Sequence, residues 1–230
     1  MARKRIRLRQ LYWILGLTLL GILLAPTLRL LWHPPPSPHT TAPEPPLPWR
    51  VTLDAHGRPV VFGFTLAGST VADARRQLGE DGQWAILARE GSPHVLEAYD
   101  PDFTAGYIEG KLILRFEGEP ALLEREFARR GKKAPTAGGA RKVELKDSDL
   151  APFTGLELTL ITFLPKASLD EAVIRERFGP PTYEWKDEEG GTRHYLYPER
   201  GIHVLRDERG HTVIEYATPE RLRRLAPAQH

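Results

Sequence analysis

Residues 68–79 read GSTVADARRQLG. Val71, Ala74 and Leu78 lie at helical spacing, so this stretch predicts a short helix with one apolar face. It begins with a Gly-Ser-Thr start signal and closes with a glycine, as helices in globular proteins commonly do. We therefore expect a helix that packs one side against other elements of the fold.

A second stretch of the same kind follows at a spacing of 100 residues. Residues 168–179 read SLDEAVIRERFG, in which Ser168 to Glu171 matches a capping box and Gly179 ends the helix. The two prolines that come next forbid its continuation. Leu78 corresponds to Phe178, and Gly79 to Gly179. A duplicated unit would give this correspondence.

Each helix lies in the same order of elements: a β-rich run, the helix, a meander of short strands and a closing helical segment. The expected strands are residues 60–66, 84–89, 94–99 and 107–116 in the first half and 156–164, 183–186, 193–197, 202–206 and 211–216 in the second, and the closing helical segments are 120–130 and 219–225. This order predicts an α+β fold with two similar units, each packing a short helix on an antiparallel sheet. A single α+β domain whose two helices merely look alike is the alternative.

The chain before Trp49 differs from the rest. Residues 11–32 carry only one charge. As a helix, this apolar stretch is long enough to cross a membrane. Five cations precede them and place the N-terminus in the cytoplasm by the positive-inside rule: Arg3, Lys4, Arg5, Arg7 and Arg9. The expected division is a basic arm 1–10, a transmembrane helix 11–32, a Pro-rich linker 33–49, a first unit 50–131, an inter-unit linker 132–150 and a second unit 151–230.

Two other interpretations of the apolar stretch remain: a cleaved signal peptide and a buried core helix. The stretch is longer than a signal core of about 7 to 15 residues, and no clean cleavage site follows it, so we favour the uncleaved anchor. Residues 33–49 read HPPPSPHTTAPEPPLPW, a composition typical of an extended polyproline spacer.

Charge and cysteine content exclude several classes of protein. From Trp49 onward the chain has 26 Lys and Arg against 29 Asp and Glu, so its basic isoelectric point comes from the N-terminal arm. A nucleic-acid-binding domain is therefore not expected. The absence of cysteine excludes disulfides, thiolate metal sites, a thiol nucleophile and a lipidated cysteine.

The sequence carries no P-loop, nucleophile elbow, zinc-protease or dinucleotide-binding signature. Ser69 and Ser168 stand at helix starts, where capping is the default role. His194, His203 and His211 fall on three successive expected strands, and a zinc site with Asp187 or Glu215 is an alternative to surface histidines. We expect no catalytic residues, no metal and no cofactor.

One basic concentration lies outside the N-terminal arm. Its six cations are Arg129, Arg130, Lys132, Lys133, Arg141 and Lys142. They are candidate contacts for a partner or for anionic lipid headgroups. The alternative is a hydrated connector between the two units, because residues 134–139 have linker composition.

Residues 68–79 resemble the G-x-[ST]-x3-[VA]-x3-L-G helix of the BamE (SmpA/OmlA) outer-membrane assembly lipoproteins. The later Trp185, the run Tyr195 to Pro198 and the run Gly201 to Gly210 are similar to that family's meander. A tandem pair of such units resembles the β-lactamase inhibitor protein. The resemblance implies a protein-binding, non-catalytic module, although this chain lacks the family's lipidated cysteine.

Taken together, the sequence predicts a single-pass inner-membrane protein of a bacterial cell envelope. Its two periplasmic units would bind another envelope protein and no nucleic acid. The alternatives are a periplasmic enzyme acting on a cell-wall or small-molecule substrate, and a ligand-binding sensor.

Overall fold

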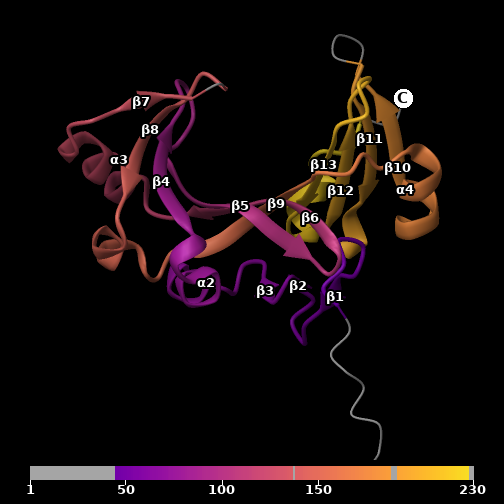
Figure 1. Cartoon of the computed structure of the whole chain (residues 1–230), viewed down its shortest axis with the longest axis horizontal. Helices are drawn as coiled ribbons and strands as arrows, with labels where there is room; N and C mark the ends of the chain where they lie inside the picture. Colours follow the sequence, from indigo (N-terminus) through magenta and orange to yellow (C-terminus); the bar gives the residue numbers. More distant parts are fainter. Residues whose placement is uncertain (1–44, 137, 188–190, 228–230) are drawn as a thin grey trace, which may run out of the picture. The chain divides into compact units, whose positions relative to one another are not determined.

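The computed structural model of the chain describes residues 45–136, 138–187 and 191–227 (Figure 1). These described residues form one compact unit. The expected basic arm with its five cations, the expected transmembrane helix 11–32 and residues 33–44 of the expected linker lie outside the described residues. Within the described part of the chain, no helix combines the length and the apolar character that crossing a membrane requires.

The main element is a ten-stranded antiparallel sheet (Figure 1). Its strand order is β10-β11-β12-β13-β9-β6-β5-β4-β8-β7. The strands are β4 (Gln83–Ala88), β5 (Val95–Ala105), β6 (Ile108–Glu117), β7 (Ala134–Pro135), β8 (Arg141–Leu145), β9 (Glu157–Pro165), β10 (Tyr183–Lys186), β11 (Arg193–Tyr197), β12 (Ile202–Arg206) and β13 (Thr212–Tyr216). This sheet, together with a few short helices, agrees with the expected α+β class.

The remaining elements are short. A three-stranded sheet consists of β1 (Thr52–Leu53), β2 (Pro59–Val61) and β3 (Phe64–Thr65), and the α-helices of the described residues are α2 (Val71–Leu78), α3 (Pro120–Arg129), α4 (Glu171–Phe178) and α5 (Pro219–Arg223). The single strand expected over residues 60–66 is therefore wrong. A tight turn divides it, with Phe62 and Gly63 both at positive φ, so that β2 and β3 form a hairpin.

Helix α2 forms where its sequence predicts it. The Thr70 hydroxyl accepts a hydrogen bond from the Asp73 N–H, and the Asp73 carboxylate accepts one from the Thr70 N–H, which completes a capping box. The three predicted apolar residues are buried. Gly79 ends the helix at φ 59°, a conformation that favours glycine. Ser69 has another role than capping, since its hydroxyl accepts from the Thr65 N–H.

Helix α4 begins two residues later than a Ser168 cap would place it. Asp170 is the N-cap, and its Oδ1 accepts from the Val173 N–H at 2.8 Å. The Ser168 hydroxyl instead donates to the Gly210 carbonyl oxygen at 2.7 Å. The predicted cap is therefore wrong, because the Asp170 carboxylate, two residues on, accepts from an N–H of the first helical turn. Gly179 at φ 81° ends the helix as expected.

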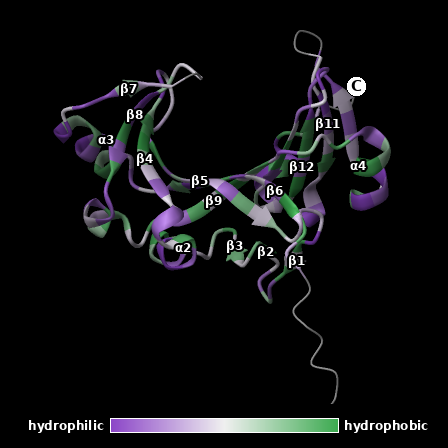
Figure 2. Cartoon of the chain, in the orientation of Figure 1, coloured by the Kyte–Doolittle hydropathy of each residue, from purple (hydrophilic) through white to green (hydrophobic). Residues whose placement is uncertain are grey.

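One face of the sheet carries the main core. Helices α2, α3 and α4 and the β2–β3 hairpin all contribute to the same apolar cluster, so they cover the same face. Helix α4 shows hydrophobic and hydrophilic residues side by side in Figure 2, as expected for a helix with one buried side. Helix α5 contributes to a second cluster, with Leu160, Leu196 and Leu222, on the opposite face.

Segment 132–150 does not serve as a linker throughout. It contributes β7 and β8, and β8 pairs with β4 from Trp84↔Leu145 to Ala88↔Arg141. The sequence does not predict this strand, because its alternating apolar pattern is short: only Val143 and Leu145 of β8 are buried. The strands of both expected units belong to one sheet, joined by the pairing of β6 with β9.

The end of the Pro-rich segment belongs to the folded part. Leu47 is buried, and the hydroxyl of the fully buried Tyr216 donates to the Pro48 carbonyl oxygen at 2.8 Å. The Arg200 guanidinium donates to the Trp49 carbonyl oxygen at 2.7 Å. A spacer over 33–49 is therefore too long by at least three residues, since these hydrogen bonds fix residues 47–49 to the sheet.

Replacing Tyr216 with Phe tests this attachment. The change leaves the buried Pro48 carbonyl without its donor, so we expect a loss of about 1–3 kcal/mol in the free energy of unfolding. Urea denaturation of the full-length protein measures it. Tyr107→Phe is the matched control, because Tyr107 is 68% exposed and should lose little. Equal stability of the two variants would contradict the role of this hydrogen bond.

Candidate functional site

The face opposite α2–α4 is left open over β8, β4, β5 and β6. Strand alternation sends Trp84 and Ile86 into the core and turns Gln83, Ala85 and Leu87 to the other side. There Gln83 lies opposite Tyr99, and Tyr99 lies opposite Ile113. We call the outward residues of these four strands the open face.

The next cross-strand row of the open face is charged. Ala85 lies opposite Glu97, and Glu97 lies opposite Arg115. The Arg115 guanidinium donates twice to Glu97 Oε1, at 2.8 and 2.9 Å. Both side chains are partly buried, so this two-bond ion pair is better ordered than a single contact between freely exposed charges.

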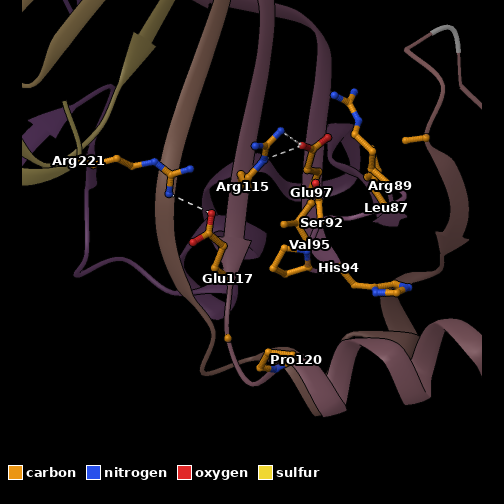
Figure 3. Close-up of a pocket in the computed structure, with 13 residues that line it drawn as sticks. Leu87, Arg89, Ser92, His94, Val95, Glu97, Arg115, Glu117, Pro120 and Arg221 are labelled. Carbon is orange, nitrogen blue, oxygen red and sulfur yellow. Dashed lines mark hydrogen bonds and ion pairs between the residues drawn. The ribbon is translucent and has the colours of Figure 1, made fainter. Parts of the chain in front are cut away.

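A hollow with a volume of about 450 Å³ lies at one end of the open face (Figure 3). Leu87 and Val95 give it an apolar floor, and Figure 3 shows the Arg115–Glu97 pair beside a second ion pair, Arg221–Glu117 at 3.0 Å. Arg221 comes from α5, which closes the open face on this side. The remaining lining residues are Arg89, Ser92, Pro93, His94, Gly118, Pro120 and Ala140.

Two polar groups in this hollow differ from the paired charges. The Arg89 guanidinium donates to the Gly138 carbonyl oxygen at 3.1 Å and, among the described residues, has no carboxylate partner. His94 Nδ1 is buried and has no hydrogen-bond partner among the described residues. The His94 ring packs edge-on against Phe127. The Arg89 guanidinium could therefore donate hydrogen bonds to a carboxylate of a bound molecule.

A second hollow of about 520 Å³ continues along β4. It shares Leu87 and Glu97 with the first and extends over Ala85 and Tyr99 to the Lys142–Glu144 pair. Strand β4 rises by about 20 Å over this distance, at ~3.3 Å per residue. The two hollows together have four cations and three carboxylates in their lining: Arg89, Arg115, Lys142, Arg221, Glu97, Glu117 and Glu144.

The predicted basic concentration is dispersed by the fold. Arg129 and Arg130 both pair with the buried Glu126, and Arg130 also pairs with Asp149 at 2.9 Å. Lys133 lies over the Phe127 ring. These side chains fix the end of α3 to the segment that follows β8.

The other members of that group lie elsewhere. Lys142 pairs with Glu144 on β8, and Arg141 and Lys132 are exposed. Of the six candidate contact residues, Lys142 alone lines either of the two hollows. Sequence reasoning missed Arg89, Arg115 and Arg221, because they are far apart in the chain and only strand pairing and α5 bring them together.

The three histidines considered for a zinc site are separated by the fold. His194 and His203 are buried and in contact with each other, whereas His211 is exposed and bonded to Asp207 in the turn before β13. No group of three or more metal-ligating side chains is found in residues 45–136, 138–187 and 191–227. Asp187 and Glu215 each contact one ring of the buried pair.

Comparisons of the chain with protein-family models, with curated proteins and with solved structures found no match.

Acid stability tests the ion pairs of α3. A hydrogen bond from Arg129 lowers the pKa of Glu126, and one from the Lys146 N–H, with another from Arg130, lowers the pKa of Asp149. The unfolded chain therefore takes up these protons first as the pH falls below about 4.5, so stability is lost on acidification. We expect Glu126→Gln to reduce this loss.

Urea denaturation at several values between about pH 6 and pH 3 measures the effect. Glu124→Gln is the control, because Glu124 lies exposed on the same helix and forms no ion pair with another described residue. If Glu126→Gln and Glu124→Gln lose stability with the same dependence on pH, the role of Glu126 is contradicted.

Proposed function

We propose that the chain is a non-catalytic protein-binding or scaffold module of the bacterial cell envelope. Residues 11–32 would anchor it in the inner membrane with the N-terminus in the cytoplasm and the C-terminal domains in the periplasm. The open face would bind an extended segment of another envelope protein. The observation that carries this proposal is the row of hollows along β4, lined by half-buried apolar residues and ion pairs.

The chemistry of the open face indicates what kind of segment fits. Leu87, Val95 and Tyr99 are partly buried and offer apolar area to a side chain laid along β4. Arg and Tyr are enriched where protein interfaces gain most of their affinity. Arg89 has no carboxylate partner among the described residues, so the bound segment should place a carboxylate near it.

The sequence supports the location and the class of protein. Five cations before an uncharged stretch are the pattern of a single-pass anchor with a cytoplasmic N-terminus. The helix over residues 68–79 resembles that of the BamE family, whose members bind other envelope proteins. The proposal for this chain rests on that resemblance, on the anchor pattern and on the open face together.

In-cell photocrosslinking tests the binding surface. We expect a photoreactive residue at Gln83, which is exposed on the open face, to capture an envelope protein that mass spectrometry identifies. The same residue at Glu124, exposed on α3 at the other side of the sheet, should not capture it.

The captured partner is then purified and its affinity for the full-length protein measured. Arg89→Glu reverses the cation that meets the expected carboxylate, so we expect binding to weaken by roughly tenfold or more, with a smaller dependence on salt. Glu124→Arg is the control for a surface charge change. Capture from both positions alike, or unchanged affinity of Arg89→Glu, would contradict the proposed surface.

A topology assay tests the anchor separately. Alkaline phosphatase, which is active only after export, is fused to the C-terminus and should be active in the wild-type fusion. Replacing the five N-terminal cations with Gln removes the orientation signal, so activity should fall. An inactive wild-type fusion that is expressed at full length would refute a periplasmic C-terminus.

A further inference from the structure

Two buried histidines form a direct hydrogen bond on the side of the sheet away from α2–α4. His194 of β11 is 9% exposed and His203 of β12 is 4% exposed. His194 Nδ1 lies 3.0 Å from His203 Nε2. Neighbouring imidazoles this close, in a buried place, must share a proton between the two nitrogens, because two bare lone pairs would repel.

A carboxylate stands at each end of this pair. Asp187 Oδ2 is 3.0 Å from His194 Nε2, and Glu215 Oε2 is 3.2 Å from His203 Nδ1. All four ring nitrogens therefore take part in one chain of three hydrogen bonds, which runs from the end of β10 across β11 and β12 to β13.

Counting protons along the chain gives its charge. Ionised carboxylates only accept, so each outer ring nitrogen must carry a proton, and the two inner nitrogens need one proton between them. Three ring protons are required, whereas two neutral imidazoles carry two. With both carboxylates ionised, the three hydrogen bonds form together only if the His194–His203 pair holds one extra proton, whose positive charge would lie between the two carboxylates.

The pair also fastens an edge of the sheet. Trp185 of β10 stacks on the His194 ring, with centroids 4.5 Å apart and planes 11° apart. A positively charged imidazole gains from the face of an indole ring. Strand β10 is only four residues long and, among the described strands, pairs with β11 alone. The ring stack and the contact to Asp187 therefore stabilise an edge strand that has few hydrogen bonds of its own.

A second extra proton would break this arrangement. His194 Nδ1 and His203 Nε2 would then both carry hydrogen across a 3.0 Å gap, and two positive rings would face each other in a buried place. The rings would have to separate, and His194 would draw away from Trp185 or from its partner. Acidification supplies this second proton, since imidazole is the side chain most readily protonated just below neutral pH.

Other charged groups near the pair are already engaged. On the opposite face of β10 and β11, Glu184 pairs with Arg175 and Arg193, and Lys186 pairs with Glu208. On α5, Arg221 pairs with Glu117 and Arg223 with Glu199. Thr162 of β9, which lies opposite Glu215, is uncharged. Within the described residues, the charged groups that hydrogen-bond to the pair are Asp187 and Glu215.

We propose that Asp187, His194, His203 and Glu215 form a one-proton catch, which holds β10 and Trp185 on the sheet at neutral pH and releases them on acidification. This device is independent of the proposed binding face on β4–β6. It would make the edge of the second half of the sheet sensitive to the acidity around the protein, while β6 and β9 in the middle of the sheet stay paired.

Hydrogen–deuterium exchange of the full-length protein, purified in mild detergent, tests the catch. Exchange in peptides covering residues 182–187 is compared at about pH 7.5 and pH 5 after correction for the intrinsic rate. We expect it to rise by roughly tenfold or more on acidification, while exchange over β6 stays unchanged. The His203→Gln variant keeps a polar side chain at this position but cannot take up a proton, so it should lose this response.

His211→Gln is the matched control, because the His211 side chain is exposed and hydrogen-bonds to Asp207 alone among the described residues. It should respond to pH as the wild type does. Unchanged exchange of residues 182–187 in the wild type, or an equal response in His203→Gln, would overturn the proposal.

A measurement on the wild type guards against a variant that fails to fold. The ring nitrogens of histidine are labelled with ¹⁵N, and their signals are recorded at about pH 7.5. We expect one histidine pair with three ring protons that exchange slowly with water, and loss of these signals near pH 5. Rings that all exchange freely at pH 7.5 would refute the shared proton.

Discussion

The antiparallel pairing of β6 with β9 is the contact on which the rest of the fold depends. It runs from Gly110↔Pro165 to Glu117↔Glu157 and joins the last strand of the first meander to the first strand of the second half. Each meander alone would leave a long unpaired edge. Because the two edges satisfy each other, α2, α3 and α4 can cover one face of a single sheet, and the part of the opposite face that α5 does not cover stays open.

Local signals predicted the elements well and their assembly poorly. Strands β10, β11 and β12 lie where the alternation and the turn residues place them, and α2 ends at its predicted glycine, although Thr70 rather than Ser69 caps it. The sequence favoured two separate units, however, because nothing local records that β6 meets β9. The same reason explains the segment 132–150: β8 becomes a strand through its pairing with β4, not through its own composition.

The residues of the open face show why site prediction from sequence fell short. The basic residues near position 130 are candidates because their charges are adjacent in the chain. In the structure, however, Arg130 forms ion pairs with Glu126 and Asp149. Of the arginines around the hollow, Arg89 directly follows β4 and Arg115 lies on β6, whereas Arg221 of α5 is more than 100 residues further along the chain. The sequence predicts that the histidines of β11 and β12 are neighbours on a sheet. It does not predict that their ring nitrogens face each other between two carboxylates, because this depends on side-chain positions.

The attachment of Pro48 and Trp49 has a mechanical consequence. Tyr216 and Arg200 hold these two residues at the second half of the sheet, where β13 is bordered by β12 on one side and β9 on the other. A pull that reaches the fold along the preceding chain is therefore delivered to an interior strand. An interior strand shares the load between two ladders of hydrogen bonds, whereas an edge strand such as β10 would peel away one bond at a time.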